Sequence, residues 1–177
     1  LLPNIKLTLA NTGGIKLGTK FCRDQTRPGI GLYGIDNYGQ NIRLLSKDLI
    51  LPFELHAPII QIRNVNINQP ISYNGIEKTK RNSTLATIGI GYADGWLRLL
   101  KPHSHFWLYK KRCNILGNIT MDSFVLDITD IKEKVFTEGD YFCLLDNSNI
   151  SSIIKNSELI SYELLTLLGS RLVRDYN

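Results

Sequence analysis

Cysteine and methionine are scarce in this chain of 177 residues. Its three cysteines, Cys22, Cys113 and Cys143, are widely spaced and form no CxxC pair. This pattern disfavours a disulfide framework and favours a reducing, cytoplasmic location. The chain starts at Leu1 and its only methionine is Met121, so we expect a fragment, a processed chain or the product of a split gene.

Long apolar runs and clusters of charge are also lacking. No apolar stretch approaches the roughly 18 residues of a membrane span, and the start has no basic segment followed by an apolar core. The formal net charge is +5, but the basic residues are scattered, with the densest runs at 78–81 and 110–112. We therefore expect neither a membrane protein nor a nucleic-acid binder, and we favour a small anionic ligand as the use of a few of these charges.

Several catalytic motifs are absent from the sequence. It holds no GxSxG, no HExxH and no cysteine with an obvious histidine partner. His103 and His105 would share one face of a strand, as metal ligands sometimes do, but no third ligand lies near them in the sequence. We therefore predict no metal site.

One motif is present but stands in the wrong context. Residues 29–34, GIGLYG, match the GxGxxG pattern of dinucleotide-binding proteins. That pattern needs a strand before it, a helix after it and an acidic residue about 20 positions on. Here Arg27-Pro28 precedes it and residues 36–39, DNYG, break any helix directly after it. We exclude dinucleotide binding and expect the glycines to let the backbone approach a neighbouring strand or a ligand closely.

The first part of the chain has a β/α character. Two short apolar runs, residues 7–10 and 28–34, each read as a short buried strand with a tight loop of small residues. The loop NTGG at 11–14 offers the Thr12 hydroxyl and flexible backbone amides, which often hold phosphate, and Arg27 precedes the second loop. Either loop alone is more often a plain turn. Two of them on successive β/α units are typical of the phosphate site of a TIM barrel.

From Pro58 onward the period of the apolar residues predicts a mostly-β domain. We expect a bulge near Asn64, where the alternation slips by one residue. Near the end, Ser161 is expected to cap a helix that stops at Gly169. The alternating sets are Ile60 and Ile62; Val65 and Ile67; Ala86, Ile88, Ile90 and Tyr92; Phe124, Leu126 and Ile128; and Phe142 and Leu144.

Residues 91–98, GYADGWLR, closely resemble the signature of the alanine racemase family. RPGI at 27–30 and LYG at 32–34 match upstream family segments in the same order, and the resemblance covers nearly the whole chain. The family's fold is a TIM barrel followed by a mostly-β domain. The resemblance thus implies a multi-domain fragment: residues 1–48 as the C-terminal end of the cofactor-binding TIM barrel (α/β), and residues 49–177 as the mostly-β C-terminal domain.

The resemblance implies a pyridoxal-phosphate-dependent isomerase that interconverts L-alanine and D-alanine and so supplies D-alanine for peptidoglycan. Thr12 matches the residue whose hydroxyl holds the cofactor phosphate, beside the backbone amides of Gly29 and Ile30. Arg27 matches the arginine that faces the pyridine nitrogen. A guanidinium does not readily give up a proton, so the ring nitrogen stays unprotonated and the cofactor's electron-withdrawing power is restrained.

Tyr73 matches the tyrosine that acts as the base on one face of the substrate. The second base, on the opposite face, is the lysine that also binds the cofactor covalently. Met121 matches the position whose backbone helps to receive the substrate carboxylate, and Tyr92 and Arg98 resemble residues of the corridor through which substrate arrives. In the family the tyrosine base reaches into the partner subunit's site, so the resemblance implies a homodimer that shares its active sites.

The sequence departs from the family in several places. Ser170 stands where many members have a tyrosine that contacts the phosphate, Asn118 replaces a usual arginine of the corridor, and residues 74–76 loosen the loop after the catalytic tyrosine. Nothing in the chain resembles the family's lysine segment, so we expect activity to need an N-terminal half that carries this lysine. A non-catalytic remnant of a split gene and a racemase of broader amino-acid specificity remain alternatives.

An incomplete barrel has a structural consequence. Two β/α units cannot close a barrel, so their apolar faces stay uncovered. We predict exposed apolar surface at Leu7, Leu9, Ile30 and Leu32 when the chain is studied alone.

Overall fold

The computed structural model describes residues 4–35, 49–75, 77–103, 105–157 and 159–176. The chain divides into two compact units. Unit 1 comprises Leu1–Glu54 and Asp146–Ser151, and unit 2 comprises Leu55–Leu145 and Ser152–Asn177. Residues 36–48, which include the helix-breaking DNYG segment and end at the expected domain boundary, lie outside the described residues.

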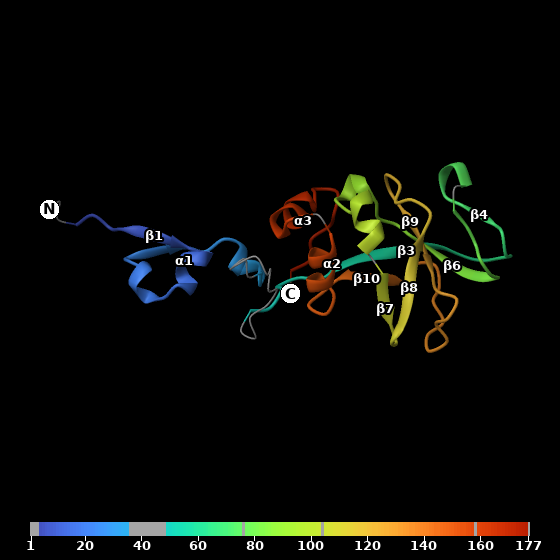
Figure 1. Ribbon diagram of the computed structural model, residues 1–177, viewed down its shortest axis with the longest axis horizontal. Coiled ribbons are helices and arrows are strands. Elements are labelled where there is room, and N and C mark those ends of the chain that lie inside the picture. The colour runs from blue at the N-terminus through green and yellow to red at the C-terminus, as the bar shows by residue number, and fades with distance from the viewer. Residues whose placement is uncertain (1–3, 36–48, 76, 104, 158, 177) are drawn as a thin grey trace. The chain divides into compact units, whose positions relative to one another are not determined.

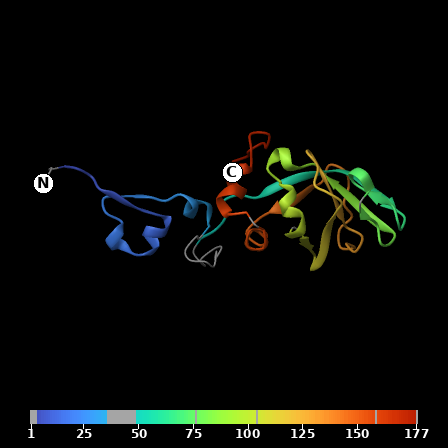
Figure 2. The ribbon, with the colours of Figure 1, turned by 45° about the horizontal axis from the view of Figure 1, so that its top comes forward.

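Unit 1 contains two parallel strands, each followed by a short helical segment. Strand β1 (Thr8–Asn11) leads into α1 (Thr12–Lys16) and η1 (Thr19–Phe21), and β2 (Gln25–Arg27) leads into η2 (Ile30–Tyr33). The strands pair in parallel, with Asn11 opposite Arg27. In both views α1 lies beside β1 (Figures 1 and 2). The Asn11 side chain starts α1 by accepting a hydrogen bond from the Gly14 amide at 3.0 Å. The expected β/α arrangement is confirmed.

The second strand of unit 1 is not where the sequence placed it. Residues 28–34 were expected to contain a buried strand, but the strand is the exposed segment Gln25–Arg27, and Ile30–Tyr33 forms a 3₁₀ turn. Pro28 has no N–H for a strand ladder, which explains why β2 ends before it. The turn ends at Gly34 in the left-handed region, where an added Cβ would lie 2.4 Å from the Ile50 carbonyl.

The expectation of exposed apolar side chains in unit 1 is confirmed at three positions of four. Leu7, Leu9 and Leu32 are 56%, 53% and 65% exposed. Ile30 is only 4% exposed, so its predicted exposure was wrong. The reason is the 3₁₀ turn: Ile30 begins it and its carbonyl accepts from the Ile35 amide, whereas a strand would have left the side chain on an open face.

Unit 2 is built on a six-stranded antiparallel sheet with the order β10-β3-β6-β9-β8-β7. The longest strand, β3, runs between β10 and β6 (Figure 1). A separate two-stranded hairpin, β4 and β5, carries the turn η3 (Tyr73–Gly75) between its strands. The strands are β3 (Leu55–Val65), β4 (Pro70–Ile71), β5 (Glu77–Lys78), β6 (Ser83–Ile88), β7 (His105–Leu108), β8 (Lys111–Leu116), β9 (Phe124–Asp127) and β10 (Tyr141–Leu145).

An aromatic cluster forms part of the core of unit 2. The Phe106 ring lies 6.2 Å from the rings of Trp96 and Phe124 and 5.2 Å from that of Phe142, centroid to centroid. All four side chains are buried, so their apolar surface is removed from water. The alternation predicted for β9 and β10 is confirmed, since Phe124, Leu126, Phe142 and Leu144 are all buried.

The bulge of β3 lies closer to the start of the strand than predicted. The register with β6 shifts between Ile59 and Gln61, not near Asn64. The extra residue is Ile60, which is 54% exposed, while Ile59 is 1% exposed. A bulge reverses which residues of the following strand face the core. Because Ile59 and Ile60 are equally apolar, the sequence does not indicate which of them is the bulged residue.

Short helices complete unit 2. These are η4 (Tyr92–Asp94), η5 (Arg98–His103), α3 (Ser161–Leu167) and α2 (Ile150–Asn156), the last crossing from one unit to the other in sequence. The helix at 161 was predicted, but its cap is Ile160, whose amide donates to the Glu163 carboxylate at 2.9 Å, and Leu168 ends it in an extended conformation. Among the described residues, no helix has the length and apolar character needed to cross a bilayer.

Candidate active site

The residues predicted to hold the cofactor come together in unit 1. The Thr12 hydroxyl oxygen accepts hydrogen bonds from the backbone amides of Gly29, at 3.1 Å, and Gly31, at 3.2 Å. Ile30 lies between these two amides in the sequence. A Cβ at Gly31 would lie 2.8 Å from the Thr12 methyl carbon, so this close approach requires glycine. The loops after β1 and β2 thus meet at one hydroxyl. A hydroxyl that accepts from two amides can still donate its own proton, as phosphate binding requires.

Arg27 lies at the same end of the two strands. It is the last residue of β2, and its guanidinium Nη2 donates to the Leu9 carbonyl of β1 at 3.1 Å. This bond reaches across the strand pair whose final register is Asn11 opposite Arg27. The guanidinium therefore lies over β1 at Leu9, three residues before Thr12 in the chain.

Tyr73 is displayed by a tight turn in unit 2. Tyr73 is 74% exposed. The other predicted site tyrosine, Tyr92, is 40% exposed. The neighbours of Tyr73 adopt left-handed backbone angles, with φ of 63° at Ser72 and 62° at Asn74. Such angles are uncommon for residues other than glycine and occur where tertiary structure fixes a turn.

Tyr92 and Met121 are joined through the backbone. The amide of Tyr92 donates to the Thr120 carbonyl at 3.0 Å, and the amide of Ala93 donates to the Met121 carbonyl at 3.0 Å. A Cβ at Gly91 would lie 2.3 Å from the Thr120 carbonyl oxygen. Only glycine allows the two backbones to approach this closely.

The loop at 117–123, between β8 and β9, connects the predicted site residues of unit 2. At one end the Asn118 carbonyl accepts from the Ser72 hydroxyl at 3.3 Å, next to Tyr73. At the other end the loop carries Met121 and contacts the turn of Tyr92. Arg98 begins η5 and is exposed. The 117–123 loop therefore links the turns of Tyr73 and Tyr92 to Met121, and among the described contacts none joins Arg98 to this loop.

Sequence reasoning missed a carboxylate beneath this loop. One oxygen of Glu77 accepts from the Gly117 amide at 2.8 Å and pairs with the Lys101 ammonium at 2.8 Å. The bonds tie the hairpin of Tyr73 to both the 117–123 loop and η5. A glutamate in a short polar strand carries no motif, so no pattern in the sequence could have identified it.

A second missed cluster involves Asp94, Asp122 and Arg171. Asp94 is 8% exposed and accepts from the Gly91 amide at 2.9 Å. The Arg171 guanidinium lies 3.1 Å from Asp94 and 2.6 Å from Asp122. Asp94 stands within GYADG and could have been found from that motif. Arg171, in the C-terminal segment, carried no such signal.

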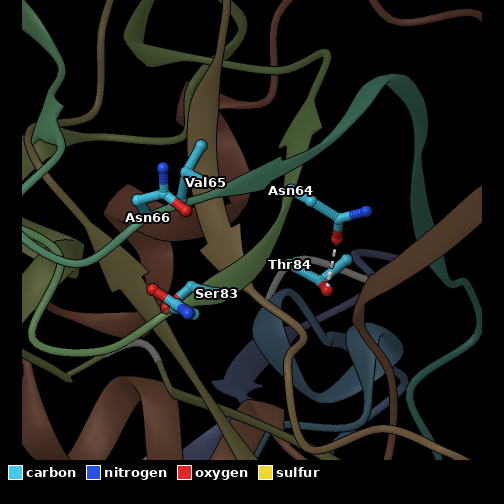
Figure 3. A pocket seen from close by; sticks show the side chains of 6 residues that line it. Asn64, Val65, Asn66, Ser83 and Thr84 are labelled. Carbon is cyan, nitrogen blue, oxygen red and sulfur yellow. Dashed lines mark hydrogen bonds between the residues drawn. The ribbon is translucent and has the colours of Figure 1, made fainter.

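The predicted site residues do not line the pocket described in unit 2. That pocket has a volume of about 320 Å³ and lies where β3 and β6 meet, with the Thr84 hydroxyl donating to the Asn64 side chain at 2.8 Å (Figure 3). Its lining is Asn64, Val65, Asn66, Asn82, Ser83 and Thr84.

Comparison with known proteins identifies the family of the chain. Residues 52–176 match the family described as "Alanine racemase, C-terminal domain". The alanine racemases of Rickettsia rickettsii and Brucella ovis are 36% and 35% identical, over 98% and 99% of this chain and 46% and 47% of their own lengths. The crystal structure of alanine racemase from Bartonella henselae, with covalently bound pyridoxal phosphate, is 37% identical, with a TM-score of 0.80 over 99% of this chain and 48% of that one.

These relatives and this structure are all racemases, and their matches cover both the β/α units and the mostly-β domain of this chain. The chain belongs to the alanine racemase family and contains that family's C-terminal domain. It spans about half the length of the curated relatives that it matches.

Proposed function

We propose that this chain is the C-terminal half of a pyridoxal-phosphate-dependent alanine racemase, which interconverts L-alanine and D-alanine for peptidoglycan synthesis. Residues 1–48 then form the end of its TIM-barrel cofactor domain, and residues 49–177 form its mostly-β domain. The observation that carries the proposal is the meeting of the Gly29 and Gly31 amides at the Thr12 hydroxyl, in a chain 37% identical to a racemase that binds this cofactor.

The residues of unit 1 fit the cofactor's chemistry. Thr12 and the backbone amides of Gly29 and Ile30 would hold the phosphate, because hydroxyl and N–H groups donate to phosphate oxygens. The Gly29 amide, which donates to the Thr12 oxygen here, would then donate to a phosphate oxygen instead. A Cβ at Gly29 would meet nothing within 4 Å, so there is open space beside this amide. Arg27 would face the pyridine nitrogen. When bound, pyridoxal phosphate delocalises the negative charge left as the α-proton departs.

In this account Tyr73 carries the proton of one substrate face at its phenol oxygen. Its exposed position on a fixed turn supports this role, since a base must reach the Cα–H bond without rearranging. Met121 would receive the substrate carboxylate through its backbone, and Tyr92 and Arg98 would line the corridor. The second base is a lysine, which we assign to an N-terminal half.

We propose two further features of the complete protein. It is a homodimer in which Tyr73 serves the partner subunit's site, and the 74% exposure of this tyrosine in a single chain supports that arrangement. It works in the cytoplasm, which fits the free thiols of Cys22, Cys113 and Cys143.

The experiment is a racemase assay of this chain assembled with a half that carries the lysine, with and without added pyridoxal phosphate. We expect cofactor-dependent conversion of L-alanine to D-alanine and far slower conversion of L-serine and L-lysine. Comparable rates on all three would favour a racemase of broader specificity. No conversion, with a stop codon or frameshift in the DNA immediately upstream, would favour the non-catalytic remnant.

A further inference from the structure

The C-terminal segment of unit 2 packs directly onto the turn that carries Tyr92. A Cβ at Gly95 would lie 2.2 Å from the Leu167 carbonyl oxygen at the end of α3. Beyond α3 the chain folds back on itself, because the Arg174 guanidinium donates to the carbonyls of Leu168, at 3.1 Å, and Gly169, at 3.4 Å. This arrangement presents Arg171 to the turn.

Arg171 bridges two carboxylates that belong to different loops. Its Nε atom lies 3.1 Å from Asp94 of the Tyr92 turn, and its Nη2 atom lies 2.6 Å from Asp122, next to Met121. The two carboxylates use separate nitrogens of one planar fork, which a lysine ammonium cannot reproduce.

The bridge connects to the backbone bonds of the candidate site. The second oxygen of Asp94 accepts from the Gly91 amide at 2.9 Å, which closes the turn, and the Ala93 amide in that turn donates to the Met121 carbonyl at 3.0 Å. Arg171 therefore holds Met121 from both sides: through Asp122 on its own loop, and through Asp94 and the turn.

We propose that Arg171 is a positioning residue that fixes the Met121 peptide for the substrate carboxylate; this rests on the proposed function. Stability alone does not explain the Arg171–Asp122 half of the bridge, because these side chains are 53% and 61% exposed, whereas the Asp94 side chain is 11% exposed. Ion pairs between exposed groups contribute little to stability. Their geometric effect, in contrast, is to fix two loops relative to one another.

The first test is amide hydrogen exchange of the full chain. In Arg171→Met, the amides of Gly91 and Ala93 should exchange about tenfold faster than in the parent chain, since local opening becomes easier. Arg112→Met is the matched control: it removes the same charge and a comparable side chain, but the Arg112 guanidinium bonds to the Asn114 side chain of its own strand, β8. Unchanged exchange in Arg171→Met would overturn the proposal.

The second test is the kinetics of the chain assembled with its lysine-bearing half. We expect Arg171→Met to raise KM for alanine about tenfold with little change in kcat, the pattern seen when substrate and transition state lose the same binding energy. Arg171→Lys and Asp122→Asn should each give a smaller rise, because one of the two ion pairs is left. A parental KM in Arg171→Met, with an active parent enzyme, would overturn the proposal; an inactive parent would overturn the proposed function and this inference with it.

Discussion

The carboxylate of Glu77 accepts a hydrogen bond from the backbone amide of Gly117 at 2.8 Å. Gly117 begins the loop that carries Met121, and Glu77 lies just beyond the turn of Tyr73. The same carboxylate oxygen also pairs with Lys101. One half-buried carboxylate therefore connects three segments of the candidate site: the hairpin of Tyr73, the 117–123 loop and η5.

Removing this acceptor should destabilise unit 2. We expect Glu77→Ala to lower the free energy of unfolding by about 1–3 kcal/mol, the usual effect of losing a hydrogen bond to a charged group. Glu77→Gln keeps an acceptor for Gly117 and should lose less. Urea unfolding followed by tryptophan fluorescence measures both, since Trp96, in unit 2, is fully buried. Equal losses in the two variants would contradict the role assigned to the Gly117 bond.

The Thr12 hydroxyl should govern cofactor affinity. Thr12→Val removes the oxygen to which the Gly29 and Gly31 amides donate, and we expect it to weaken pyridoxal phosphate binding about tenfold or more. Thr12→Ser keeps the oxygen and is the matched control. Titration of the assembled protein with the cofactor, followed by its absorbance, compares the variants. Equal affinity of Thr12→Val and the parent would count against the phosphate site.

The close contact between Gly91 and Thr120 should tolerate no side chain. We expect Gly91→Ala to cost about 3 kcal/mol of unfolding free energy, because its Cβ would lie 2.3 Å from a backbone oxygen that cannot move aside alone. Gly13→Ala is the control, since its Cβ would meet only the Asn11 side chain at 3.5 Å. Thermal melting of the two variants gives the comparison, and similar melting temperatures would show that the 91–95 turn shifts easily.

The sequence alone predicted those features of the fold that depend on residues close together in the chain. Phe124 and Leu126 alternate and are buried, and the capping residue Asn11 with the glycines after it marked the first loop. The second strand of unit 1 was predicted within residues 28–34, because these residues are apolar. The actual strand is the preceding exposed segment, Gln25–Arg27. Pairing with β1, a tertiary effect, makes that polar segment a strand.

The candidate site shows the same limit. Tyr73 and Thr12 were predicted from motifs, whereas Glu77 and Arg171 act through partners 24 or more positions away in the chain. Such contacts depend on which loops the sheet brings together. Nothing in the local sequence of Glu77 or Arg171 encodes that proximity.

Cys113 should be the least reactive thiol of the three. Burial, with a smaller effect of Asp127 and Asp130, raises the pKa of Cys113 from its ordinary value of 9.0 to about 11. At pH 8 only about 0.1% of this thiol is ionised, and we expect iodoacetamide to label it at least tenfold more slowly than Cys22, which is half-buried. Mass spectrometry of the labelled peptides measures the ratio, and equal labelling would show that the core around Cys113 opens readily.

The same shift fixes the direction of a pH effect on stability. A folded-state pKa above the unfolded one means that burial of the neutral thiol stabilises the protein fully below pH 9, and that this contribution is lost as pH rises toward 11. We expect Cys113→Ala to lose less stability than the parent chain over this range. Urea unfolding at pH 8 and pH 10.5 tests it, and parallel losses would contradict the assignment.

The most direct test of the central claim, that Tyr73 is one of two bases, is α-proton exchange in deuterated water. In the chain assembled with its lysine-bearing half, Tyr73→Phe should lower racemisation by about 100-fold or more, the usual effect of losing a general base. Deuterium should still enter one enantiomer of alanine, through the lysine on the other face, while its entry into the opposite enantiomer is lost. Racemisation near the parental rate, or equal loss of exchange from both enantiomers with the cofactor still bound, would contradict the account.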